Sequence, residues 1–139
     1  MFIKGLHFDN WVNGRDKGEF IQDQNQDQDL NWGMIEKILT ELNGVNKTQV
    51  VLSKDEDIHM GIGGGNSGLY NVYATFDNVS FFNLLDLSKS EDKIIQLVTG
   101  GQKGDFSANN CVDLETMLKA AKLFALEGEI NDRLNWQHV

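Results

Sequence analysis

Residues 48–99 form a run of short β-like segments with no space between them for a helix. Each segment alternates apolar and polar residues or is rich in β-branched ones, and Gly, Asn and Asp separate them because the chain contains no proline. The expected strands are 48–53, 57–62, 69–76, 79–87 and 94–99. Strands joined by short turns pair antiparallel. This run therefore predicts a mostly antiparallel sheet.

Two helical patterns flank the run. Apolar residues recur at helical spacing from Met34 to Leu42 and again from Leu114 to Ala125. Asp29 or Asn31 can cap the first helix and Gly44 suits its end; Asp113 and Gly128 have these roles for the second. Further strands are expected at 2–8, 19–22 and 133–139. We expect one α+β domain over 1–139: a single twisted, mostly antiparallel sheet of about five to seven strands, with two main helices packed on it.

The glycine-rich segment 61–68 contains G-x-G-x-x-G, read from Gly63. In nucleotide-binding proteins this pattern is followed by a helix whose N-terminus holds the phosphates. Here LYNVYATF follows, which has the period of a strand. The segment is therefore predicted to be the turn of a β-hairpin, with glycines supplying positive φ.

The chain carries a net charge of −9, which disfavours binding to nucleic acid or an anionic membrane and favours a basic partner. No apolar run reaches the length of a membrane span, and the N-terminus does not read as an export signal, so a cytoplasmic protein is expected. The single cysteine, Cys111, cannot form an internal disulfide. No catalytic constellation, resident metal or cofactor is predicted.

An alternative is a small ligand- or metal-binding domain or an enzyme. It would use either the Gly61–Gly68 loop or one face of a strand carrying Asp55, Asp57 and His59. The same alternation is typical of the solvated side of an amphipathic strand.

The C-terminal string VDLETMLKAAKLFALEGEINDRLNWQHV resembles the end of immunity protein family 1 of bacterial polymorphic toxin and contact-dependent inhibition systems. The matching features are a helix with paired alanines at Ala120-Ala121, then Phe124, Gly128 and Trp136. The hairpin 59–76 is similar to the glycine-containing hairpin of that family, and the resemblance spans about residues 30–139. Related sequences often carry a proline before the tryptophan, and this chain has none.

The resemblance implies a non-enzymatic protein that binds and neutralises the C-terminal effector domain of a cognate toxin. The toxins of this family include nucleases and nucleic-acid deaminases, whose active sites must be basic. The protein is expected to be a monomer or a weak homodimer. Contacts are expected from exposed acids and one exposed tryptophan: Trp11, Asp23, Asp27, Asp29, Asp55, Glu56 and Asp57.

Replacing Asp23, Asp27 and Asp29 together with Asn tests the polar tract 22–29 as a steering surface. Association with the basic toxin domain should slow, and the slowing should shrink as salt is added, because salt screens long-range attraction. Stopped-flow or biosensor kinetics measure this. An unchanged association rate would assign steering to another part of the chain.

Overall fold

A computed structural model describes residues 1–22 and 30–139. Seven strands form one sheet in the order β11-β8-β7-β6-β5-β1-β4, with antiparallel neighbours throughout. Their bounds are β1 (Gly5–Phe8), β4 (Glu19–Gln22), β5 (Gln49–Ser53), β6 (His59–Gly64), β7 (Tyr70–Thr75), β8 (Phe81–Leu85) and β11 (Asn135–His138). Two small hairpins add β2 (Trp11–Val12) with β3 (Arg15–Asp16), and β9 (Ile94–Thr99) with β10 (Gln102–Ser107). The predicted α+β class is confirmed.

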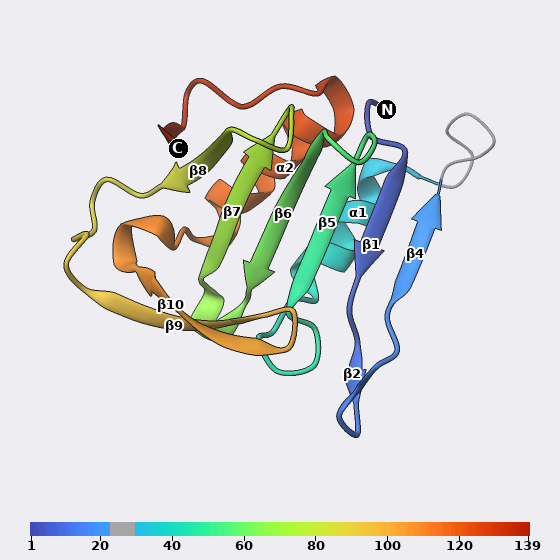
Figure 1. Ribbon diagram of the computed structural model, residues 1–139, viewed down its shortest axis with the longest axis horizontal. Coiled ribbons are helices and arrows are strands. Elements are labelled where there is room, and N and C mark those ends of the chain that lie inside the picture. The colour runs from blue at the N-terminus through green and yellow to red at the C-terminus, as the bar shows by residue number, and fades with distance from the viewer. Residues whose placement is uncertain (23–29) are drawn as a thin grey trace.

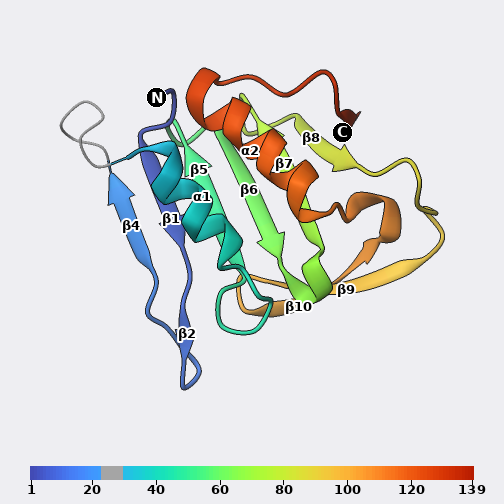
Figure 2. The same ribbon diagram turned by 180° about the vertical axis from the view of Figure 1, so that it is seen from behind.

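Both helices, α1 (Trp32–Thr40) and α2 (Leu114–Glu127), lie against the same face of the sheet (Figures 1 and 2). The core fills the space between them. It consists of alternate strand residues such as Leu52 and Ile62, packed against the buried sides of Ile35 on α1 and Phe124 on α2. In the ranges the structure describes, no helix is long and apolar enough to cross a membrane.

The helix ends follow local sequence signals. The side chain of Asn31 accepts from the Met34 amide at the start of α1, and Gly128 ends α2 at φ 71°. The predicted end of the first helix was too late. Helix α1 stops at Thr40 because the Asn43 side chain, which accepts from three following amides, builds a turn there instead.

The prediction of a strand at 94–99 is confirmed, but its partner β10 was not predicted. Gly100 and Gly101, both at positive φ, reverse the chain between β9 and β10. This β9–β10 arm crosses one end of the sheet on the side away from the helices (Figure 1), where Thr99 lies against Gly63. A Cβ on Gly63 would come within 2.3 Å of the Thr99 hydroxyl oxygen, so the arm can approach because β6 has no side chain at that position.

Asp9 is a buried carboxylate at the end of β1, 5% exposed. It accepts hydrogen bonds from the amides of Thr48 (2.7 Å) and Gln49 (2.9 Å), from the Thr48 hydroxyl and from the indole of Trp11 (2.8 Å). The Thr48 hydroxyl oxygen in turn accepts from the amide of Gly101 at 2.9 Å. One carboxylate thus joins the N-terminal strands, β5 and the turn of the β9–β10 arm.

Asp9→Ala should lower the free energy of unfolding by about 2–4 kcal/mol, because it leaves buried amides without an acceptor. Asp105→Ala, which removes an exposed carboxylate on β10, is the matched control and should change stability by less than about 0.5 kcal/mol. Urea denaturation measures both. Equal stability of the two variants would show that Asp9 does not anchor these segments.

Candidate binding surface

The face of the seven-stranded sheet opposite the helices, here called the open face, carries no Asp, Glu, Lys or Arg on its strands. Strand alternation and the pairing register assign its residues. They are Phe20 and Gln22 (β4), Gly5 and His7 (β1), Gln49, Val51 and Ser53 (β5), His59, Gly61 and Gly63 (β6), Asn71, Tyr73 and Thr75 (β7), Phe81, Asn83 and Leu85 (β8), and Asn135 and Gln137 (β11). In a chain with 24% charged residues, this departs from the polar solvated face that antiparallel sheets commonly show.

Aromatic rings cross the open face in a band. The rings of His7 and Phe20 are 6.4 Å apart on β1 and β4. Beyond β5, His59 on β6 meets Tyr73 on β7 edge-on at 5.7 Å, and Tyr73 meets Phe81 on β8 at 5.8 Å. Aromatic residues are enriched, and charged residues depleted, at the centres of protein–protein interfaces. The composition of the open face is therefore that of a binding surface.

A glycine makes room for the centre of this band. An added Cβ on Gly61 would lie 2.2 Å from a ring carbon of Tyr73, which is directly opposite in the register. The Tyr73 ring therefore lies over β6 at Gly61. Burial raises the pKa of its hydroxyl.

The acidic turn formed by Asp55, Glu56 and Asp57 lies between β5 and β6, at the end of the sheet away from the β9–β10 arm (Figure 1). All three residues are exposed. The Asp55 carboxylate accepts from the amides of Asp57 and Ile58, both at 2.9 Å, so it holds the turn in shape. Glu56 and Asp57 are left facing solvent as the negative edge of the open face.

The proposed strand face of Asp55, Asp57 and His59 is not present. Strand β6 begins only at His59, and residues 54–58 form the turn, because the Lys54 amide already pairs with the Ile58 carbonyl. Within 1–22 and 30–139, no group of three or more His, Cys, Asp or Glu side chains is placed to hold a metal ion.

The glycine segment forms the predicted hairpin. Strand β6 runs into a single 3₁₀ turn (Asn66–Gly68), and β7 returns antiparallel to it. Gly64, Gly65 and Gly68 all have positive φ. Cys111 is fully buried, and this burial raises the pKa of its thiol.

Trp11 is not the freely exposed side chain that the sequence suggested. Its indole donates to Asp9, and an added Cβ on Gly101 would lie 2.5 Å from the Trp11 ring. It is half-buried between the N-terminal hairpin and the β9–β10 arm, at the opposite end of the sheet from the acidic turn. The other predicted contacts, Asp23, Asp27 and Asp29, lie outside the residues that the structure describes.

The open face was not predicted from the sequence. Its signal is the alternation in each strand, where the residues between the core positions are uncharged. In β7, for example, Asn71, Tyr73 and Thr75 alternate with buried Val72 and Ala74. These uncharged residues can be assigned to one surface only when the order and register of the seven strands are known.

The molecule is thus an α+β domain with two helices on one sheet face and an uncharged, aromatic opposite face. The family model of the immunity protein Imm1 matches residues 31–138. The chain belongs to the Imm1 family of immunity proteins. No curated protein matches it.

His59 should make stability depend on pH. Burial lowers its pKa, and the nearby Asp55 carboxylate only partly opposes this. The unfolded chain, with a histidine pKa of about 6.5, then binds the proton more readily than the folded one, so stability falls as pH drops below that value.

Urea midpoints measured at several pH values between about 7.5 and 5 cover this window, above the range where most carboxylates titrate. The His59→Gln variant should lose part of the decrease that the parent shows, whereas His138→Gln, an exposed histidine on β11, should retain it. Identical slopes for all three proteins would contradict the assignment.

Proposed function

We propose that this protein neutralises a cognate toxin that acts on nucleic acid, a nuclease or a deaminase, by binding its effector domain and covering the basic region around its active site. Membership of the Imm1 family supports toxin neutralisation. The observation that supports a nucleic-acid-directed toxin is the net charge of −9, together with an exposed acidic turn beside an uncharged face.

The electrostatic argument concerns both partners. An enzyme that binds nucleic acid must present Lys and Arg to the phosphates. An acidic protein is attracted to that same surface, and opposite charge speeds diffusional encounter. An inhibitor bound there excludes the substrate without any chemistry of its own, so the protein acts without catalysis, in the cytoplasm of the cell that makes the toxin.

The contact residues expected from the sequence keep separate roles in this proposal. Asp55, Glu56 and Asp57 are exposed and can steer a basic partner, as can Asp23, Asp27 and Asp29 of the polar tract. Trp11 can contribute only the part of its ring that the β9–β10 arm leaves uncovered.

The proposal is tested by co-expressing the chain with the effector domain of the large secreted protein encoded beside it. Cells should survive only when both are made, and a one-to-one complex should co-purify. In a purified assay, cleavage or deamination of nucleic acid should stop at one equivalent of inhibitor. Continued killing despite folded inhibitor would reject that pairing, and a toxin that leaves nucleic acid intact would reject the proposed toxin class.

A further inference from the structure

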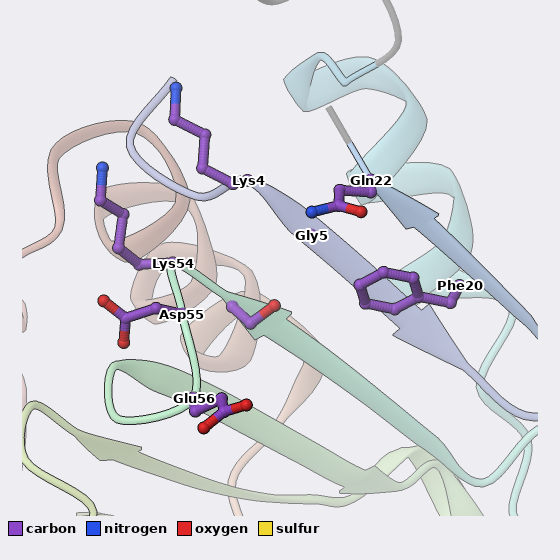
Figure 3. A pocket seen from close by; sticks show the side chains of 8 residues that line it. Lys4, Gly5, Phe20, Gln22, Lys54, Asp55 and Glu56 are labelled. Carbon is purple, nitrogen blue, oxygen red and sulfur yellow. The ribbon is translucent and has the colours of Figure 1, made fainter. Parts of the chain in front are cut away.

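An open pocket of about 420 Å³ lies at the end of the open face nearest the acidic turn (Figure 3). Gly5 of β1 lines the pocket beneath the Phe20 ring of β4 and the Ser53 hydroxyl of β5. A Cβ on Gly5 would lie 3.2 Å from two carbons of that ring and 2.7 Å from the Ser53 hydroxyl oxygen, so the ring covers the glycine and forms one wall of the pocket (Figure 3). Phe20 is 58% exposed, although phenylalanine is among the residues most often buried, and its ring lies 6.4 Å from that of His7.

Charged residues line the side of the pocket across from Phe20 (Figure 3). Lys4 and Lys54 line the pocket, but their ammonium groups point away from Phe20 (Figure 3), and that of Lys54 lies 5.3 Å from the centre of the Phe2 ring. Asp55 and Glu56 lie on the same side of the pocket as Lys54. Interface hot spots are often aromatic anchors, and the contacts beside such an anchor exclude water from it.

The open face beyond the pocket extends the same chemistry. From Phe20 it continues through His7 and Val51 to Gly61 and Tyr73, which are successive partners in the register. The acidic turn borders one end and the β9–β10 arm the other. The surface is therefore continuous, uncharged and bounded by defined segments.

We propose that the open face is the docking surface for the toxin domain, and that an apolar side chain of the toxin packs against the exposed part of the Phe20 ring in this pocket. This inference rests on the proposed function. The matching patch of the toxin is apolar at its centre and basic where it meets Asp55, Glu56 and Asp57. Charge selects this occupant over a second copy of the chain, which would bring another net charge of −9 to the same surface.

Three variants test the surface, each with a matched control. Phe20→Ala removes the exposed wall, and its control is Val45→Ala, a residue 78% exposed in the loop after α1. Gly5→Ala displaces the Ser53 hydroxyl and the Phe20 ring, whose nearest atoms would lie 2.7 Å and 3.2 Å from the added Cβ, and its control is Gly33→Ala on α1. Val51→Lys places a cation in the middle of the open face, and its control is Val45→Lys.

Affinity for the co-purifying toxin domain is measured by biosensor, after circular dichroism and urea midpoints establish folding. Each open-face variant should weaken binding at least about tenfold, mainly through faster dissociation, and each control should stay within about twofold of the parent. Phe20→Ala, at an exposed edge-strand position, keeps the test decisive if Val51→Lys destabilises the fold.

The outcomes separate the two proposals. If the parent binds and inhibits the toxin but all three open-face variants behave as their controls, the function holds and this docking surface is overturned. If the parent protein binds no toxin, both the proposed function and the proposed docking surface are rejected. Sedimentation velocity of the chain alone gives a further check: loss of a dimer on Phe20→Ala, with toxin affinity unchanged, would assign the face to self-association and overturn the inference.

Discussion

The buried carboxylate of Asp9 lies where the N-terminal strands, the start of β5 and the turn of the β9–β10 arm meet. Three of its four hydrogen bonds come from Thr48 and Gln49 at the start of β5, and the Thr48 hydroxyl oxygen in turn accepts from Gly101 in the arm. The ring of Trp11 is held by the same carboxylate and covers that turn. Because every donor around Asp9 is buried or half-buried, water cannot replace the carboxylate as the acceptor of these hydrogen bonds. The arm and the N-terminal hairpin are therefore positioned relative to the sheet, and with them one boundary of the open face.

The second constraint is the placement of both helices on one side of the sheet. The two helices cover the hydrophobic core on that side and leave the open face to solvent. Two glycines in β6 shape the open face: Gly61 lets the Tyr73 ring lie across the strand, and Gly63 lets Thr99 of the arm approach. Side chains at these positions would lift both neighbours away from the sheet. The glycine-rich segment that contains the G-x-G-x-x-G pattern thus has a packing role, because it lets aromatic and arm residues lie close against β6.

Most helices and strands could be predicted from local sequence signals. Asp113 and Gly128 bound α2 as expected, since a cap depends on a few adjacent residues. The hairpin around Gly64 follows from glycine and strand period alone. Strand β10 was missed because QKGDFS has neither a β-branched run nor a clear alternation, and it forms only by pairing with β9. Asp9 reads in the sequence as an ordinary loop carboxylate, because all of its donors except the Trp11 indole are about forty residues away. The open face needed the register of seven strands, which no single segment encodes.

In the proposed complex, the acidic turn and the uncharged open face would act on different steps of toxin binding. Charges that stay solvated at a rim change how fast partners meet, and salt weakens them. Apolar groups that become fully buried change how long partners stay together, because dissociation must return them to water. In the proposed complex, Glu56 and Asp57 would belong to the first kind and Phe20 to the second, although all lie at one end of the sheet. On this proposal, net charge indicates the steering residues from the sequence alone, whereas the residues that would determine the lifetime of the complex carry no charge and are found only from the fold. An immunity protein needs both, since its toxin must be captured quickly and held while the cell lives.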